Sequence, residues 1–317
     1  MVTVDDFLVI TNNPPLRDKA KLHIQTKYKL KDLGPVTHIL GWKVTRDTTG
    51  IKLSQPAYIK TLLSKYGLQD AKTAPSPIAS EILNTPEHAT KALDTKKYDY
   101  HGIIGSIRYL ADSTRPDISF IIGFLGRHAH KPTTAHWQAA LRVLRYLNAT
   151  QDQGLHYKTG LHSTLQAHSD SDYAACVTTR RSTSGTYILY NDSPVAWQSK
   201  RQRFIATSTW AAEYVAAFHT AQHIICLRNL LADLNHAETK PTPLRMDNVG
   251  AITTANTTHP TPKSKHIDVK YHYIKELIDR KEISISYIPS SENCADILTK
   301  AFKPAQYKER LPLLRLS

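Results

Sequence analysis

Residues 161–317 alternate between short runs of strand-forming residues and longer runs in which apolar side chains recur at helical spacing. Three strand-like runs come first, followed by a long helix, a strand, two helices, a strand and a final helix. This order predicts an α/β layer built on a mixed five-stranded sheet with flanking helices. We expect strands at 165–173, 185–190, 194–199, 244–247 and 283–288, and helices at 208–234, from 248, at 268–280 and from 293.

Two breaks divide the rest of the chain. The first is the Pro-containing run TAPSP at 73–77 with the polar stretch that follows it, and the second is NATQDQG near 148–160. We therefore predict three regions, 1–74, 75–160 and 161–317. The first should hold a β-rich run at 2–11, a basic helix at 16–28, two strands around a Thr-Thr-Gly turn and a helix at 58–66. The second should be a linker and then mostly helical, with helices at 103–110, 118–128 and 134–147.

The charge of the chain indicates a polyanionic partner. The 317 residues include 41 Lys and Arg against 27 Asp and Glu, which gives a formal net charge of +14 and a pI near 9.5. Such a partner is most often nucleic acid, although many basic proteins bind none. The three cysteines are far apart in the sequence and form no C-x-x-C pair, which argues against a disulfide framework or a cysteine zinc site. No apolar run is long enough to cross a bilayer and no signal sequence is evident, so we expect a reduced intracellular protein.

Four acids occur at the ends of predicted elements in 161–317. Asp170 is in the first strand, Glu213 in the first turns of the long helix, Asp247 at the end of the fourth strand and Asp296 in the last helix. Acids at helix starts usually serve the helix dipole, so one alone is weak evidence. Four carboxylates gathered at one edge of a sheet would repel one another unless a hard dication lay between them. Oxygen ligands favour Mg²⁺ or Mn²⁺, and two such ions would suit phosphodiester hydrolysis.

Several ordered motifs resemble the Pol polyproteins of copia-type LTR retrotransposons. The words HSDSDYAAC, RRSTSGTYILY, PVAWQSKRQ, ATSTWAAEY, LRMDN, SKHIDVKYHYIKE and ENCADILTK resemble the RNase H domain of that family. The middle words IIGSIRYLADSTRPDISF and AHWQAALRVLRYL resemble the connection before it, and VTVDDFLVIT resembles the end of a reverse-transcriptase palm. The resemblance covers essentially the whole chain. It implies an RNase H-like fold, preceded by a truncated palm and thumb remnant and a helical connection.

The resemblance also implies a function and a set of site residues. It implies a ribonuclease H that cleaves the RNA strand of RNA–DNA hybrids with two Mg²⁺ or Mn²⁺ ions held by Asp170, Glu213, Asp247 and Asp296. Asp172 matches a second acid of the first motif and is as consistent with a structural role as with a metal site. The residues expected to contact nucleic acid are Arg180, Arg181, Ser182, Thr183, Ser184, Lys265 and His266, although an exposed polar turn would explain the first five equally well.

The amino-terminal motif TVDD resembles a polymerase hairpin with two of its acids, Asp5 and Asp6. Nucleotide transfer needs a third acid from an earlier strand of the palm, and the resemblance begins inside the hairpin. We therefore interpret Asp5 and Asp6 as a remnant polymerase site and expect no primer extension from these 317 residues.

A reverse transcriptase fits the ancestry that the resemblance implies but not an activity of these 317 residues. Two other interpretations of the whole chain remain open on the sequence. In the first, the chain is a metal-dependent ribonuclease H, which the four acids favour. In the second, it is a decayed or co-opted fragment that binds nucleic acid without catalysis, which the incomplete hairpin favours. Other products of the retrotransposon polyprotein would be further partners. The expected location is the cytoplasm, within a virus-like particle, or the nucleus, with no secretion and no membrane contact.

Overall fold

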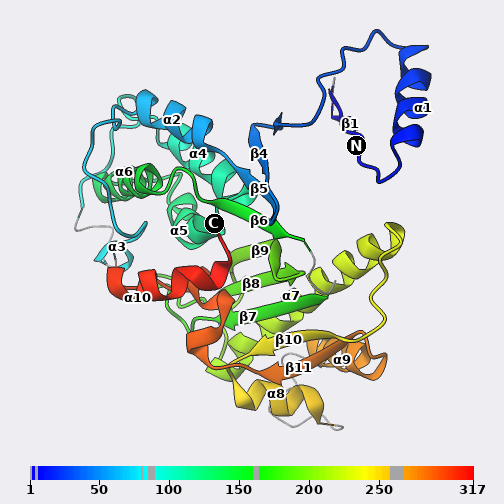
Figure 1. Cartoon of the computed structure of the whole chain (residues 1–317). Helices are drawn as coiled ribbons and strands as arrows, with labels where there is room; N and C mark the ends of the chain where they lie inside the picture. Colours follow the sequence, from blue (N-terminus) through cyan, green and yellow to red (C-terminus); the bar gives the residue numbers. More distant parts are fainter. Residues whose placement is uncertain (1, 4–5, 80, 85–89, 160–163, 258–267) are drawn as a thin grey trace.

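The computed structural model describes residues 2–3, 6–79, 81–84, 90–159, 164–257 and 268–317 (Figure 1). Its centre is a five-stranded sheet in the order β11-β10-β7-β8-β9. The strands are β7 (Leu165–Ser171), β8 (Thr183–Tyr190), β9 (Ser193–Arg201), β10 (Thr242–Met246) and β11 (Ile283–Tyr287). β7, β8 and β9 are antiparallel, whereas β10 runs parallel to both β7 and β11. The predicted mixed five-stranded sheet with flanking helices is confirmed.

A tight hairpin joins β8 to β9. Asn191 and Asp192 form its turn with φ values of 54° and 55°. Two consecutive left-handed residues are typical of a type I′ turn, and Asn and Asp tolerate that conformation better than most other residues. The Asn-Asp pair therefore fixes the register in which β8 and β9 meet.

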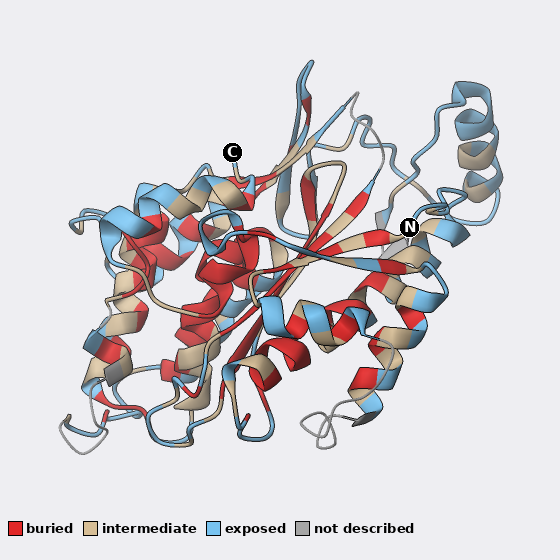
Figure 2. Cartoon of the chain, turned by 90° about the horizontal axis from the view of Figure 1, so that it is seen from below, coloured by how far each residue is buried: buried red, intermediate tan, exposed pale blue. Residues whose placement is uncertain are grey.

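Helices cover both faces of this sheet (Figures 1 and 2). Ile188 of β8 packs into a cluster with the helices on one face, whereas its neighbours Tyr187 and Leu189 pack into the cluster on the other. The first face carries α7 (Thr209–Asp233), α8 (Val249–Asn256) and α9 (Asp268–Asp279). The opposite cluster includes residues of α2 (Pro56–Lys65), α4 (Tyr100–Ser113), α5 (Ser119–Arg127), α6 (Thr134–Ala149) and α10 (Pro304–Arg310). β8 is thus buried on both sides, which explains its nearly continuous apolar and small residues.

A second, four-stranded antiparallel sheet has the order β3-β4-β5-β6. It consists of β3 (His38–Ile39), β4 (Trp42–Arg46), β5 (Gly50–Ser54) and β6 (Gly154–Lys158). The strands around the Thr-Thr-Gly turn are confirmed, and their third partner, β6, comes from about a hundred residues later in the chain. β6 also lies beside the main sheet, because Asn191 donates a hydrogen bond of 3.0 Å to the Lys158 carbonyl. The short helix α3 (Glu81–Asn84) precedes α4.

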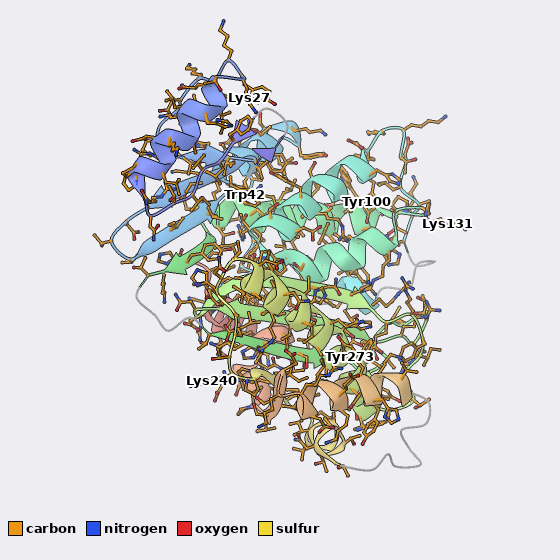
Figure 3. The ribbon with its side chains drawn as sticks, turned by 90° about the vertical axis from the view of Figure 1, so that its right-hand side faces the viewer. Lys27, Trp42, Tyr100, Lys131, Lys240 and Tyr273 are labelled. Atoms are coloured by element: carbon orange, nitrogen blue, oxygen red, sulfur yellow. The ribbon has the colours of Figure 1, made fainter. Side chains whose placement is uncertain are left out.

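The amino-terminal segment stands apart from these layers in Figure 1. It contains β1 (Val2–Thr3), β2 (Asp6–Phe7) and α1 (Pro14–Gln25), and α1 buries none of its residues. Figure 3 places Lys27 beside α1, Lys131 between α5 and α6, and Lys240 before β10, so the positive charge is distributed over distant parts of the fold. Within the described residues, no helix is both long and apolar enough to cross a membrane, and the three cysteines are free thiols.

One buried ion pair connects the middle helices to the end of the chain. Arg115 and Asp117 are both fully buried and make two hydrogen bonds, of 2.9 and 2.7 Å. Tyr146 of α6 donates to the Asp117 carboxylate at 2.7 Å, and Tyr307 of α10 donates to the Asp117 carbonyl at 3.0 Å. Arg115 also donates to the Thr150 carbonyl at 2.8 Å. The segment TRPD is therefore the centre of a buried hydrogen-bond network around the 3₁₀ turn η2 (Pro116–Ile118).

The final helix predicted from 293 is divided into two short helices. Residues Cys294–Leu298 form a 3₁₀ helix, η5, and the α-helix α10 begins only at Pro304. At the C-cap of η5, the Thr299 hydroxyl lies within hydrogen-bond distance of both the Asp296 carbonyl and the Asp170 carboxylate. That tether to β7 fixes Thr299 against the sheet, and the chain then turns before it re-enters a helix at a proline, which suits the first helical position.

Candidate active site

Asp170 lies near the end of β7 and is 1% exposed. It is directly opposite Gly185 in the β7–β8 register, and its carboxylate accepts a hydrogen bond from Thr299. A buried carboxylate needs such partners because removing it from water is costly. Asp170 is therefore held in a fixed place by elements on both sides.

Glu213 projects toward the same place from α7. The Ser208 side chain caps this helix by accepting from the Ala211 amide at 3.1 Å, which sets where the helix begins. Glu213 is 6% exposed, and one of its oxygens accepts from the Ser171 amide at 3.1 Å. The other oxygen, Oε2, has no hydrogen-bond partner among the described residues. A buried carboxylate oxygen without a partner is unusual and indicates that a cation would complete its surroundings.

Asp247 comes directly after β10. Since β10 runs parallel to β7, the carboxyl ends of the two strands lie at the same edge of the sheet. Ser290 donates to one Asp247 oxygen. One carboxylate oxygen from each of Asp170, Glu213 and Asp247 lies within 4.8 Å of the other two. Three carboxylate oxygens at this spacing match the hard, oxygen-rich ligand set of Mg²⁺ or Mn²⁺.

The electrostatics of these acids also favour the binding of a cation. Burial, together with the charges of Asp170 and Asp247, raises the pKa of Glu213 from 4.5 to about 9. Burial also raises the pKa of Asp170, against the opposing influence of Lys300. Carboxylates that cannot all ionise together are characteristic of functional sites, and a dication would reverse both shifts.

Asp296 does not join this cluster of three. It is 1% exposed, but its two oxygens form ion pairs with Lys300 and with Arg310, the second at 2.8 Å. Lys300 Nζ also lies 3.9 Å from an Asp170 oxygen. The fourth predicted acid is thus adjacent to the other three and neutralised by two basic side chains.

Gly185 sets the distance between η5 and the sheet. A methyl group at Gly185 would lie 2.7 Å from the Ala295 carbonyl oxygen and 2.8 Å from a Thr299 methyl carbon. Only glycine therefore lets η5 approach close enough for Thr299 to reach Asp170.

We expect Gly185→Ala to destabilise the fold by about 1–3 kcal/mol because the added methyl overpacks this contact. It should also displace Thr299 and so disturb the position of Asp170. Urea unfolding measures the first effect and divalent-ion binding the second. Gly105→Ala is the matched control, because a methyl there meets nothing within 4 Å and the position is exposed on α4. Equal stability of the Gly185→Ala and wild-type proteins would contradict this role.

A second prediction concerns pH. Because the pKa of Glu213 is raised on folding, its contribution to stability is present at acid pH and is lost as the pH rises toward about 9. Glu213→Gln stays neutral throughout, so in EDTA it should exceed the wild type in stability by at least about 1 kcal/mol at pH 8. Thermal unfolding across this range tests the prediction. Parallel pH profiles for the two proteins would show that Glu213 ionises normally.

Three of the residues expected to contact nucleic acid, at the start of β8, are buried. Ser182, Thr183 and Ser184 are buried, with exposures of 0%, 2% and 5%. Ser182 accepts from the Ala174 amide, and Ser184 accepts from Gln202. Thr183 and Ser184 belong to β8 and Ser182 lies directly before it, and the burial of all three leaves no surface for a phosphate contact.

Arg180 and Arg181 of the same turn remain accessible, Arg180 being exposed with a φ of 53°. Asp172 accepts from the Ala175 amide at 3.2 Å and shapes this turn, which supports its structural interpretation. Lys265, His266 and Asp5 lie outside the described residues. Asp6 is in β2, opposite Thr3 and in the separate amino-terminal segment.

Four residues of the site were not predicted from the sequence. Gln202 donates to Ser184, Ser171 and the Ala212 carbonyl, and so joins β8, β7 and α7 beneath the acids. The other three residues are Thr299, Lys300 and Arg310. Lys300 had a sequence signal, since it follows Asp296 by four residues, the spacing of a helical ion pair. Gln202 and Arg310 had none, because only the tertiary fold brings them to the site.

The strand order, with acids from the first strand, the fourth strand and the helix between them, defines an α/β domain with three carboxylates at one edge of a mixed sheet. Two solved structures are similar to this chain at low sequence identity. LC11-RNase H1 from compost is 17% identical with a TM-score of 0.35, covering 44% of this chain and 94% of that protein. A foamy viral protease–reverse transcriptase in complex with dsDNA is 14% identical with a TM-score of 0.45, covering 80% of this chain and 44% of that one.

Sequence comparison identifies the family. Residues 1–80 match the family model described as reverse transcriptase (RNA-dependent DNA polymerase). The Pol polyproteins of transposons TNT 1-94 from Nicotiana tabacum and RE1 from Arabidopsis thaliana are each 33% identical over 95% of this chain, which spans 23% and 20% of their lengths. The putative transposon Ty5-1 protein of Saccharomyces cerevisiae is 32% identical over 70% of this chain and 72% of its own length. The chain belongs to the copia-type retrovirus-related Pol polyproteins.

Proposed function

We propose that this chain is a divalent-metal-dependent ribonuclease H that hydrolyses the RNA strand of RNA–DNA hybrids. The observation that carries the proposal is the cluster of Asp170, Glu213 and Asp247, whose oxygens lie within 4.8 Å of one another at one edge of the sheet. Asp170 and Glu213 are buried there and Asp247 is half-buried, so the cluster opens to solvent on the Asp247 side. In this proposal 161–317 is the nuclease domain, 75–160 the connection and 1–74 a remnant of the polymerase region.

The residues present fit a divalent ion. Asp170, Glu213 and Asp247 would hold one ion, with the unpartnered Glu213 oxygen as a ligand. Asp170 and Asp296 would hold a second. Bound ions of this kind supply an activated water and stabilise the leaving oxygen of a phosphodiester. The chain itself contributes the placement of the ligands, through Thr299, Ser290 and the Ser171 amide.

Nucleic acid is the proposed partner, and the charge of the chain supports it. A net charge of +14 favours phosphate contacts that are independent of sequence. Arg180 and Arg181 are the basic side chains that the β7–β8 turn presents at the surface. We propose a location in the cytoplasm, within a virus-like particle, or in the nucleus.

The same charge favours a second candidate, a fragment that binds nucleic acid without cleaving it. When binding is through phosphates, the logarithm of the binding constant falls linearly with the logarithm of the salt concentration. The slope is about −0.9 per phosphate contact on a B-form duplex. Both candidates predict this dependence. Only the ribonuclease predicts that bound hybrid is then cleaved.

The test is cleavage of a hybrid whose RNA strand carries a 5′ label. The full chain should nick the RNA in Mg²⁺ or Mn²⁺ and not in EDTA, and should leave single-stranded RNA and duplex DNA intact. Asp247→Asn protein, purified in parallel, controls for a contaminating host ribonuclease. Salt-sensitive binding without cleavage in either metal would establish the second candidate instead.

A further inference from the structure

The position between Asp170 and Asp296 already holds a positive charge. Lys300 Nζ lies 3.9 Å from an Asp170 oxygen and forms an ion pair with Asp296. Both acids are almost completely buried, at 1% exposure each. An ammonium group between two buried carboxylates lies where a bridging dication would have to lie.

We propose that Lys300 occupies the second metal position in the metal-free protein and is displaced when a second divalent ion binds between Asp170 and Asp296. The inference rests on the proposed function, because it takes the three-acid cluster to be the first metal position. It assigns Lys300 a role as an exchangeable counter-ion of the site.

The two basic partners of Asp296 differ in their freedom to move. Arg310 also donates to the Ser290 carbonyl at 2.7 Å, and its guanidinium lies 4.8 Å from the centre of the Phe302 ring. Its side chain is 22% exposed, against 42% for Lys300. Lys300 makes no contact with a carbonyl or a ring among the described residues, and its flexible stem lets the ammonium move into solvent. Arg310 therefore stays with Asp296, and Lys300 is the group that leaves.

Competition between the ammonium and the ion has a measurable consequence. The second ion must displace a charge that already neutralises Asp170 and Asp296, so its observed affinity is lowered by the free energy of that contact. The first ion, held by Asp170, Glu213 and Asp247, does not require the removal of Lys300. Affinity for the second ion should therefore depend on Lys300, whereas affinity for the first should change little.

The experiment is a titration of the full chain with MnCl₂, followed by calorimetry and by the electron paramagnetic resonance of free Mn²⁺. Lys300→Met should tighten the second binding event at least about tenfold, because it removes the competing charge. Lys300→Arg keeps the charge and should leave that event weak. The matched control is Lys303→Met, since Lys303 is exposed and forms no ion pair among the described residues.

The outcomes separate the inference from the proposed function. Two binding events with the same affinities in the wild type and Lys300→Met would overturn the inference and leave the three-acid site in place. Absence of any bound ion in both proteins would overturn the proposed function and the inference with it. If Lys300→Met does not fold, the ¹⁵N resonance of the wild-type Lys300 ammonium gives the answer. It should shift with the second ion, and a resonance unchanged through both events would exclude displacement.

Discussion

Asp247→Asn protein should cleave an RNA–DNA hybrid at least about a thousandfold more slowly than the wild type. A thousandfold loss corresponds to about 4 kcal/mol of transition-state stabilisation, the magnitude expected when a charged metal ligand is removed. The fold should persist, because Asp247 is half-buried and an asparagine oxygen can still accept from Ser290. Hybrid binding should be largely retained, since Asp247 contacts no phosphate in the proposed function.

Asp172→Asn is the matched control for that variant. Asp172 lies two residues after Asp170 in the same motif but is outside the cluster of three acids. Its hydrogen bond from the Ala175 amide can be made equally by an asparagine. Cleavage by Asp172→Asn should stay within about threefold of the wild type, a difference below 1 kcal/mol. Equal loss in the two variants would show that the site is not the cluster described.

The second large effect is on stability. Asp117→Ala should lower the free energy of unfolding by about 3–5 kcal/mol, because it leaves the fully buried Arg115 charge without its partner. It also removes the acceptor of the Tyr146 hydroxyl. Urea unfolding followed by circular dichroism measures the loss of free energy. In thermal unfolding, the melting temperature should be lower by roughly 10 °C.

An exposed ion pair provides the comparison for Asp117. Asp279 pairs with Lys275 at 3.1 Å, but its side chain is 62% exposed. Asp279→Ala should therefore change the stability by no more than about 0.5 kcal/mol. If Asp117→Ala were as stable as Asp279→Ala, the buried network would not be what holds α10 to η2 and α6.

Most of the fold could be predicted because local patterns and tertiary packing agree in this chain. The run with apolar residues at 212, 215, 216 and 224 became α7, and Ser208 caps it as its position before the helix suggests. The Asn-Asp pair formed its turn for a local reason as well. The division of the last helix was not predicted, and Thr299 at that division is tied to Asp170, a partner 129 residues away that no helical pattern reveals.

The parts of the site that could be predicted likewise depend on local sequence order, and the parts that could not depend on long-range contacts. Three acids could be placed together because the order of strand, helix and parallel strand brings their ends to one edge. The ion pairs of Asp296 could not be predicted, because Arg310 reaches it from α10. The polar side chains of Ser182, Thr183 and Ser184 suggested a surface turn, yet β8 begins at Thr183, before its apolar residues, and all three side chains are buried. Small polar residues pack as easily within a sheet as on its edge, so sequence alone does not distinguish the two.

The most direct measurement of the central claim is the anomalous scattering of Mn²⁺ in crystals of the full chain. We predict a peak bound by oxygens of Asp170, Glu213 and Asp247, and no peak there in crystals of Asp247→Asn grown in the same solution. Wild-type crystals from a cleaving preparation in which Mn²⁺ is bound elsewhere, and the three carboxylates hold no ion, would contradict this assignment of the active site.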